Sequence, residues 1–538
     1  MTSTSSSAPK ERTEPTQQEA TPTTSATRAL EPARRPNRRA VMVSAVLTQL
    51  MIVLDLTIIA IALPRMQEDL GMSLSESPWT VTGYSLAFGG LVLFGGRLCA
   101  VVGIRRSYQV GLVGFAVASL AAGMATSFPV LLVSRVAQGC FGALLAPTSQ
   151  SLLNVTFTER TERERVFAIF GATGGLGAAV GLLLGGALTD WLSWRWALYV
   201  NILIAAAALL IGQRSLPPAD QRDHASRITD DLSGLVLGCG ACFSAVYGLD
   251  RAQQTSWTST STVTWLAVGV IAAVLFVIRE RFASRPVLPL SMMAMPVRAA
   301  SYATQFIAGA AQMGAIIYLT YYMQNHFGYS PFKSGVVFLP MVAALVATAI
   351  PAGRVIVPRL GARGTLPLGL AVLTGSFLIL SRMTTESTYT EVALPGLIVF
   401  GIGLGLTMPV TFNSGTRGVD ARRTGLASAI LSAAQQIGGS FGVALMTSYA
   451  TQHAEDYVAD HAEEVRAAAT EAMMRAQALP QSPAGMQIVE ALRAQLIDRA
   501  QIEAYAGGFT MMAWILAGAA AVLVACGIGL SVHRRRTR

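Results

Sequence analysis

Apolar runs long enough to cross a membrane recur along this chain from residue 40 to residue 530, and they limit its fold more than any other feature. A membrane-spanning helix needs roughly 20 mainly apolar residues to cross the ~30 Å hydrocarbon layer. Of the 538 residues, 52% are hydrophobic and 13% are charged, whereas about a quarter are charged in an ordinary soluble domain. The sequence therefore predicts an all-α polytopic membrane protein.

Fourteen transmembrane helices are predicted from these runs. The first eight are expected at 40–63, 79–103, 108–126, 129–153, 165–189, 194–213, 232–250 and 262–279. Six more are expected at 300–323, 334–352, 366–382, 392–413, 425–448 and 508–531. Arginines cluster before the first run, after the last and in alternate loops between them. Because positive residues in short loops stay on the cytoplasmic side, both termini are expected in the cytoplasm.

The charge pattern argues against binding of nucleic acid or of a nucleotide. The net charge is +10, but the arginines form short clusters between apolar runs and no continuous basic stripe. Lys10 and Lys333 are the only lysines, and neither follows the glycine spacing of a phosphate-binding loop. Cys239 and Cys242 form a CxxC pair without a second pair, so neither a metal site nor a cofactor is expected.

An internal repeat divides the chain into two halves. Gly96-Arg97-Leu98 with Gly103-Ile104-Arg105 recurs as Gly353-Arg354-Val355 with Gly361-Ala362-Arg363, each after the second span of its half. Two parallel six-helix halves with two helices inserted between them explain this arrangement. The predicted parts are a disordered cytoplasmic tail (1–39), an N-terminal six-helix bundle (40–213), two inserted helices (232–280), a C-terminal six-helix bundle (299–531) and a short cytoplasmic tail (532–538).

The longest connection between predicted spans is 450–506, which is expected on the extracytoplasmic side. It carries nine acids and four arginines, and its Ala, Glu and Arg content favours helix with a break from Pro480 to Gly485. An exposed helical spacer and a cap over the substrate path are the two interpretations of this insert.

Asp55 is a single acid in an apolar run of the first predicted span. An ionised carboxylate inside a membrane costs several kcal/mol unless it is paired or faces a water-filled cavity. No other carboxylate lies well inside a predicted span. Asp55 is therefore a candidate for reversible protonation, and a structural residue held by neighbouring hydroxyl groups is the alternative.

Arg135 is the most deeply placed cation of the fourth predicted span. A helix rises ~1.5 Å per residue, which places Asp55 about 22 Å from the inner end of its span and Arg135 about 9 Å from the outer end of its own. The two charges are thus expected at similar depth, which does not by itself establish contact. Pairing would keep Asp55 ionised, and protonation of Asp55 would release Arg135 as a switch.

Polar and aromatic residues within the spans would suit a cavity for a large, mostly apolar ligand with a few polar groups. The candidates are Tyr84, Gln138, Gln305, Gln312, Tyr318, Asn413 and Gln435. Hydrogen bonds between helices are the alternative role for each of them. Gly177, Gly181 and Gly185 recur every four residues, so they line one helix face that can approach a neighbour closely and slide against it during gating.

Several motifs resemble the major facilitator superfamily, in particular its fourteen-span drug:proton antiporter branch, over residues 40–448 and the final span. They are Leu54-Asp55-Leu56-Thr57 through Pro64, Arg135 with Gln138 and Gly139, Trp194-Arg195-Trp196 with Asn201, and Gly425-Leu426-Ala427-Ser428 through Gln436 and Gly438-Gly439. The resemblance implies proton coupling at Asp55 and Arg135. It also implies a cytoplasmic gate with Gly96, Arg97, Gly103 and Arg105.

The chain departs from the family pattern at two positions. Ala100 stands where the superfamily motif has aspartate, which leaves open the charge contact that locks the cytoplasmic gate. Leu182 stands where the antiporter motif has proline, which leaves open the kink of the fifth span.

The resemblance implies a proton-coupled antiporter of the cytoplasmic membrane that exports a small hydrophobic drug or antibiotic and confers resistance. An aromatic polyketide is the expected cargo, and protons and the lipid bilayer are the other expected partners. A carrier of a metabolite or siderophore on the same fold is the alternative, although few buried charges argue against strongly ionic cargo. An enzyme is not expected, because no Ser/His/Asp or paired-carboxylate set can be assembled within the spans.

Overall fold

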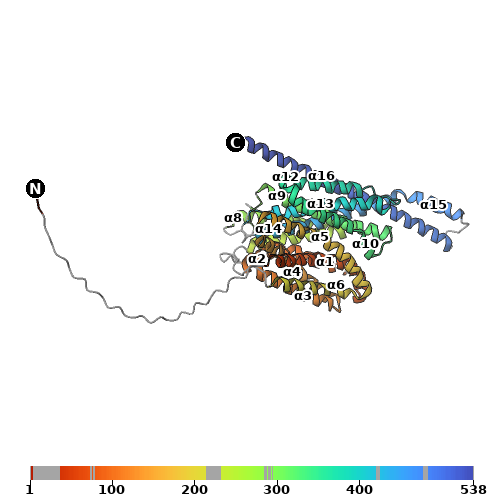
Figure 1. The fold of residues 1–538 in the computed structure, drawn as a ribbon. Helices are drawn as coiled ribbons and strands as arrows, with labels where there is room; N and C mark the ends of the chain where they lie inside the picture. Colours follow the sequence, from red (N-terminus) through yellow and green to blue (C-terminus); the bar gives the residue numbers. More distant parts are fainter. Residues whose placement is uncertain are drawn as a thin grey trace. The chain divides into compact units, whose positions relative to one another are not determined.

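A computed structural model describes residues 2–3, 37–72, 76, 79–213, 232–283, 288, 292–293, 295–419, 424–475 and 483–536. Within these ranges, every long regular element is a helix (Figure 1). A helix pairs its own backbone N–H and C=O groups, as hydrocarbon surroundings require. The predicted all-α fold is therefore confirmed, and the predicted tail 1–39 lies almost wholly outside the described residues.

The first bundle consists of α1 (Arg38–Leu70), α2 (Trp79–Val102), α3 (Ile104–Gly123), α4 (Phe128–Thr156), α5 (Arg160–Trp191) and α6 (Trp194–Gly212). The inserted pair consists of α7 (Leu232–Gln254) and α8 (Thr260–Phe282). The second bundle consists of α9 (Pro296–Tyr321), α10 (Pro331–Val337), α11 (Leu339–Pro351), α12 (Val357–Leu380), α13 (Leu394–Thr416), α14 (Thr424–Asp460), α15 (Ala462–Arg475) and α16 (Pro483–Arg536).

Eleven helical segments of the described chain are long and apolar enough to cross a membrane. One of them, Phe332–Leu380, has 49 residues and contains two of the predicted spans, which a break at Gly361 separates. Two further predicted spans correspond to α3 and α5, which are not among the eleven. The helices are thus consistent with fourteen spans.

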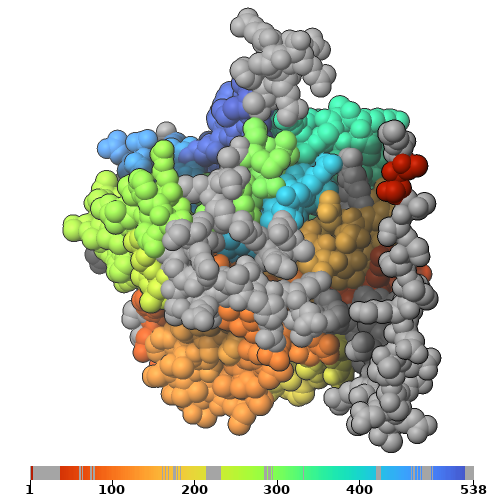
Figure 2. Space-filling view, turned by 90° about the vertical axis from the view of Figure 1, so that its left-hand side faces the viewer, coloured from red at the N-terminus to blue at the C-terminus, as the bar shows by residue number. Residues whose placement is uncertain are grey.

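Most helix contacts lie within α1–α6 or within α9–α16, and α2, α4 and α5 also contact helices of the other group. In the first bundle, α1 packs against α4, α5 and α6, and α4 packs against α2 and α3. In the second bundle, α14 packs against α9 and α16, and α13 packs against α11 and α12. The helix α7 contacts α8, α2 of the first bundle and α14 of the second. Figure 2 shows the yellow-green residues of the pair between the orange first bundle and the blue end of the second.

The repeat seen in the sequence has a conformational counterpart. Gly103 joins α2 to α3 with φ 96° and ψ 148°, and Gly361 breaks α12 with φ 66° and ψ 172°. A positive φ with an extended ψ is a backbone region that essentially only glycine occupies. The two halves therefore make the same sharp turn after their second span, and glycine is required at each.

Close helix packing is also repeated between the halves. In the first bundle, a Cβ at Gly181 of α5 would overlap Thr57 of α1. In the second, Cβ atoms at Gly438 and Gly442 of α14 would overlap backbone atoms of Phe306 and Ala310 in α9. The first and fifth helices of each half thus approach closely because glycine removes the side chain between them.

The insert 450–506 is helical where it is described. The helix α14 continues to Asp460, α15 follows, and α16 runs without interruption from Pro483 into the last span. The predicted break from Pro480 to Gly485 is wrong in its second part, because Pro483 begins α16 and Gly485 lies within it. Proline is tolerated there because the first helical residue needs no N–H partner. Pro480 lies outside the described residues.

The repeated glycine turn yields a stability prediction. Gly103→Ala and Gly361→Ala should each destabilise the folded protein by about 1–3 kcal/mol, because alanine is strained at these backbone angles. The measurement is the thermal unfolding midpoint of the purified protein in detergent. Gly375→Ala is the matched control, since a Cβ at Gly375 of α12 meets open space and alanine favours a helix interior by about 0.5–1 kcal/mol. Midpoints of the two turn variants at or above that of the control would contradict the assignment.

Candidate functional site

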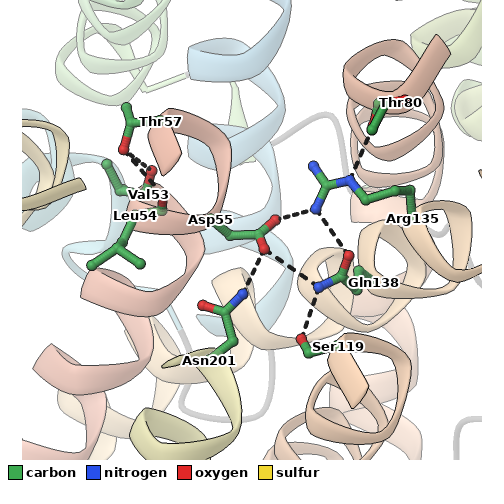
Figure 3. A network of polar contacts seen from close by, with 9 residues as sticks. All are labelled: Val53, Leu54, Asp55, Thr57, Thr80, Ser119, Arg135, Gln138 and Asn201. Atoms are coloured by element: carbon green, nitrogen blue, oxygen red, sulfur yellow. Dashed lines mark hydrogen bonds and ion pairs between the residues drawn. The ribbon is translucent and has the colours of Figure 1, made fainter. Parts of the chain in front are cut away.

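An ion pair joins Asp55 and Arg135 inside the first bundle. Arg135 Nη1 on α4 donates to Asp55 Oδ2 on α1 at 2.6 Å, and both side chains are 0% exposed. The sequence predicted that Asp55 and Arg135 lie at similar depth but not that they touch, and the structure brings the two groups into contact (Figure 3). Charge-assisted hydrogen bonds of this length are roughly twice as strong as neutral ones.

The second carboxylate oxygen has two amide donors. Asn201 Nδ2 on α6 donates to Asp55 Oδ1 at 2.6 Å, and Gln138 Nε2 on α4 donates to the same oxygen at 3.3 Å. Gln138 also donates to Ser119 Oγ on α3 at 2.7 Å and accepts from Arg135 Nη1 at 2.9 Å. The carboxylate on α1 is thus held directly by side chains of α4 and α6, and α3 contributes indirectly through the Ser119 contact with Gln138.

Arg135 is positioned by α2 as well. Its Nε donates to the backbone oxygen of Thr80 at 3.0 Å. Its guanidinium lies over the ring of Tyr84, 4.6 Å from the centroid. Thr80 and Tyr84 are four residues apart, so both face α4 from one side of α2. The cation therefore has a carboxylate, an amide, a backbone carbonyl and an aromatic face around it.

This arrangement explains how two charges can be buried where hydrocarbon surrounds the protein. Removing ions from water costs several kcal/mol for each ion, and only good geometry with additional hydrogen bonds compensates for that cost. Deleting one partner of a buried pair typically costs about 3–5 kcal/mol, because the other charge is left uncompensated. The pair is thus stable while both groups are charged, and it is sensitive to loss of the charge on Asp55 or on Arg135.

Hydrogen-bonding capacity remains beside the pair. Arg135 Nη2, Thr80 Oγ1, Tyr84 Oη and Asn201 Oδ1 are buried, with no hydrogen-bond partner among the described residues. Buried polar groups normally have partners, and internal water commonly supplies them. The site can therefore accommodate water next to Asp55 without breaking an existing contact.

The glycine face of α5 packs directly on the α1 turn that carries Asp55. A Cβ at Gly177 would lie 3.0 Å from Val53 Cβ, and one at Gly181 would overlap Thr57 Oγ1. Gly185 is buried on the same helix. Val53 and Thr57 lie on the side of α1 opposite Asp55, because residues two apart are ~200° apart around a helix. The roles of these glycines in gating stay predictions.

The structure also locates the residues predicted for the cytoplasmic gate. Gly96 is buried and Arg97 is half-buried, both near the end of α2. Gly103 forms the turn described above, and Arg105 Nη2 donates to the backbone oxygen of Gln213 at 3.3 Å. Arg105 therefore ties the start of α3 to the end of α6. Ala100 lies in α2 as predicted, and the side chain of Leu182 is outside the described part of the chain.

Two of the residues predicted to contact substrate belong to the ion-pair site instead of a separate cavity. Gln138 binds Asp55, and Tyr84 packs under Arg135. Both contacts lie within the first bundle. Their predicted role as substrate contacts stays untested. The bonds of Gln138 fit the alternative of hydrogen bonding between helices, whereas Tyr84 Oη has no hydrogen-bond partner among the described residues.

The remaining predicted substrate contacts lie mainly in the second bundle. Gln305 accepts from Thr411 Oγ1 at 2.5 Å, and Tyr318 donates to Thr447 Oγ1 at 2.9 Å. Asn413 accepts from Arg163 of the first bundle. The polar residues in this group that lie on α9, α13 and α14 are Gln305, Gln312, Asn413 and Gln435.

Sequence reasoning missed several members of the site. Asn201 appeared only within a motif, and nothing marked Ser119 or Thr80, because neutral residues in apolar runs carry no depth or charge signal. Asp250 was also missed: it lies near the C-terminal end of α7, is half-buried and accepts from Thr82 Oγ1 of α2 at 2.9 Å. Asp250 is the last residue of the predicted span 232–250 and lies four residues before the end of α7, so it does not lie well inside a span as Asp55 does.

Near the C-terminal end of α1, α1 and α6 are tied by a second and weaker ion pair. Arg195 Nη1 lies 2.7 Å from Asp69 Oδ2, and Trp194 Nε1 donates to the same oxygen at 3.0 Å. The Arg195 hydrogen bond and then the Trp194 hydrogen bond lower the pKa of the Asp69 carboxyl. Asp69 is about half exposed, so solvent screens this pair, and such pairs contribute about 0–1 kcal/mol.

Known proteins share this sequence and fold. The family model of the Major Facilitator Superfamily matches residues 45–443. The puromycin resistance protein pur8 of Streptomyces alboniger is 40% identical over 429 residues, which cover 79% of this chain and 84% of that protein. The tetracenomycin C resistance and export protein of Streptomyces glaucescens is 33% identical over 397 residues, which cover 74% of this chain and 73% of that protein.

Among solved structures, the crystal structure of the human organic anion transporter MFSD10 (TETRAN) aligns with a TM-score of 0.55 and 14% identity, covering 90% of this chain and 100% of that chain. Identity that low supports the fold alone. The family match over residues 45–443, the sequence identity to these relatives and the helical fold therefore lead to the same assignment. This chain is a multi-pass membrane protein and a transporter, not an enzyme, and it belongs to the major facilitator superfamily.

Proposed function

We propose that this protein exports a small hydrophobic drug or antibiotic in exchange for protons and thereby confers resistance. The observation that carries the proposal is the fully buried Asp55–Arg135 pair within the first bundle. A buried pair of this kind costs desolvation energy and is weak evidence for stability alone. The presence of such a pair in a transporter favours a role in which the Asp55 carboxylate changes charge during the transport cycle.

The contacts of Asp55 indicate where a proton would bind. Oδ1 already accepts from two amide groups, those of Asn201 and Gln138, whereas among the residues that the structure describes Oδ2 accepts from Arg135 alone. A proton on Oδ2 would replace the arginine and leave both amide contacts intact. Protonation would therefore break the ion pair while keeping the carboxyl group in place.

Release of Arg135 would then act on α2. The guanidinium would keep its contacts with the Thr80 carbonyl and the Tyr84 ring, both on α2. The helix α2 packs against α4 in its own bundle and against α14 in the second. A change at Asp55 can thus reach the contact between the bundles, which must rearrange when the carrier opens to the other side.

Both relatives described above are named for resistance to an antibiotic, which supports a drug as cargo. We assign the drug to polar side chains of the second bundle, among them Gln305, Gln312, Asn413 and Gln435, together with Tyr318. An aromatic polyketide remains our proposed cargo class. The neutral character of these residues suits a mostly apolar molecule with a few polar groups.

We place the protein in the cytoplasmic membrane with both termini in the cytoplasm, because the arginine clusters alternate between loops. The moving units are proposed to be 40–213 and 299–531, with 232–280 between them. The helix ends at Arg163 and Asn413 then face the cytoplasm. Asn413 accepts from Arg163 Nε at 3.1 Å, so this contact crosses between the bundles at that side.

The coupling proposal predicts a loss of active transport in Asp55→Asn. Asparagine keeps the size of the side chain but cannot bind or release a proton. Inverted membrane vesicles energised with a proton gradient should accumulate puromycin or tetracenomycin C with the wild type, whereas the variant should fall to the level of vesicles without the protein.

The control for this experiment is Asp69→Asn, the same substitution near the outer end of the same helix. Its partner Arg195 is partly exposed, so the change should cost about 1 kcal/mol at most and leave accumulation near the wild-type level. Accumulation by Asp55→Asn equal to that of the control would sink the coupling proposal. Wild-type vesicles that transport a metabolite or siderophore and neither antibiotic would favour the alternative cargo.

A second prediction concerns the pH dependence of transport. Asn201→Ala removes the shorter of the two amide contacts to Asp55 Oδ1, so the ionised carboxylate loses support while the protonated form loses less. A hydrogen bond to a charged group contributes about 1.5–3 kcal/mol. The profile of proton-driven uptake against extracytoplasmic pH should therefore move toward alkaline pH. An acid shift, or none, would show that Asn201 does not stabilise the carboxylate.

A further inference from the structure

Asp55 faces the interior of the first bundle and not the contact between bundles. Its partners lie on α4 and α6 of the first bundle. The opposite side of α1, at Val53 and Thr57, is covered by the glycine face of α5. A proton bound by Asp55 must therefore pass through the first bundle, separately from a drug held between the halves.

A second buried polar cluster lies on the same face of α1. Ser44 and Thr48 precede Asp55 by eleven and seven residues, which are close to whole numbers of helical turns. The hydroxyl groups of Ser44 and Thr48 lie 2.9 Å and 2.5 Å from Tyr108 Oη of α3. Ser44 Oγ also donates to the backbone oxygen of Ala208 in α6 at 2.7 Å. All three hydroxyl-bearing side chains are fully buried.

The same three helices supply both clusters. On α3, Ser119 of the Asp55 site follows Tyr108 by eleven residues, so the two side chains share a face. On α6, Asn201 precedes Ala208 by seven residues, which again returns to the same face. The interface between α1, α3 and α6 thus contains two polar clusters, one around Asp55 and one around Tyr108.

Between the Asp55 cluster and the Tyr108 cluster, the interface of these helices is apolar. Thr48 and Asp55 are separated by about 10 Å along α1 at ~1.5 Å per residue. Met51, Leu112 and Phe115 are fully or almost fully buried in this interval. Such a stretch blocks continuous proton leakage and would pass a proton only when water enters it transiently.

The cluster of Ser44, Thr48 and Tyr108 lies close to the surface at the Arg38 end of α1. Tyr108 is the fifth residue of α3, whose Arg105 reaches the end of α6. Arg38 pairs with Glu162 at 2.8 Å, and Arg39 and Arg106 are exposed. A proton released at Tyr108 is thus about one helical turn, ~5 Å, from solvent among positive groups.

We propose that Ser44, Thr48 and Tyr108 form a relay through which the proton of Asp55 leaves toward the Arg38 end of the bundle. This inference rests on the proposed function, since it needs Asp55 to bind and release a proton. Each hydroxyl group is both donor and acceptor, so it takes up a proton on its oxygen as it gives up its own. Each transfer reverses donor and acceptor along the hydroxyl groups, and rotation of their O–H bonds restores the relay for the next proton, while a transient water chain carries the proton across the apolar interval.

In this step Asp55 returns to the carboxylate and pairs again with Arg135. No electrons are transferred, and the balance is one proton moved from Oδ2 of Asp55 to solvent. The competing explanation is that the three hydroxyl groups only hold α1, α3 and α6 together, as hydrogen bonds between membrane helices commonly do. The two explanations differ in what happens when one hydroxyl is removed without changing the shape of the helix contact.

The test compares Tyr108→Phe with wild type in liposomes containing the full-length protein, using puromycin or tetracenomycin C, whichever wild-type vesicles accumulate. Two rates are measured: drug exchange driven by a proton gradient, and drug-for-drug exchange without a gradient, which needs no proton release. We expect Tyr108→Phe to slow proton-driven exchange by about tenfold or more and to leave drug-for-drug exchange unchanged. Thr48→Val should act in the same direction, and Thr48→Ser, which keeps the hydroxyl, should remain near wild type.

The matched control is Tyr302→Phe in α9, which removes a buried hydroxyl that donates to the Gly415 carbonyl at 3.0 Å. Equal loss of both rates in Tyr108→Phe would mean that the hydroxyl is structural, and unchanged rates in Tyr108→Phe and Thr48→Val would exclude the relay. Either result with an inactive Asp55→Asn leaves the proposed function intact. Active accumulation by Asp55→Asn would instead overturn the proposed function itself.

Discussion

The buried pair of Asp55 and Arg135 is the interaction on which the polar architecture of the first bundle depends. Two opposite charges in low-dielectric surroundings need each other and need further partners, because neither can turn to water. This requirement accounts for Asn201 and Gln138 at one carboxylate oxygen, and for the Thr80 carbonyl beside the guanidinium. The positions of α2, α4 and α6 around α1 are thus fixed by one electrostatic constraint as much as by apolar packing.

Close packing on the other side of α1 completes this arrangement. Glycine at positions 177 and 181 lets α5 lie directly against the turn that carries Asp55. A larger side chain there would push α1 toward α4 and disturb the 2.6 Å contact with Arg135. The glycine face and the ion pair therefore act on the same helix from opposite sides, and a sliding motion of α5 would be transmitted to Asp55.

Much of this architecture could be predicted from the sequence. Span length predicted the all-α membrane fold, and the Gly-Arg repeat predicted two similar halves, with which the matching turns at Gly103 and Gly361 agree. Depth counting placed Asp55 and Arg135 level with each other, but depth leaves the rotation of each helix about its axis open. Contact depends on that rotation, which packing against neighbouring helices decides.

Neutral polar residues were harder to assign for a related reason. Asn201, Ser119 and Thr80 differ little in sequence from the many polar residues that only join helices, and their importance appears once Asp55 and Arg135 are placed. Tyr84 and Gln138 were expected at the substrate and lie at the ion pair. Asp250 stands at the last residue of the predicted span 232–250, where an acid carries no signal of its own, and only the structure shows its contact with Thr82.

The two halves share their packing and differ in their chemistry. The helix α9 meets α14 through glycines as α1 meets α5, yet the buried membrane face of α9 carries the neutral amides Gln305 and Gln312 where α1 carries an acid. Neutral amides can bind a mostly apolar molecule at moderate desolvation cost, whereas an acid responds to protons. Repetition of one packing scheme with two sets of polar residues thus fits the proposal that protons bind in the first bundle and the drug in the second, with the contact of α2 and α14 among those that join the two.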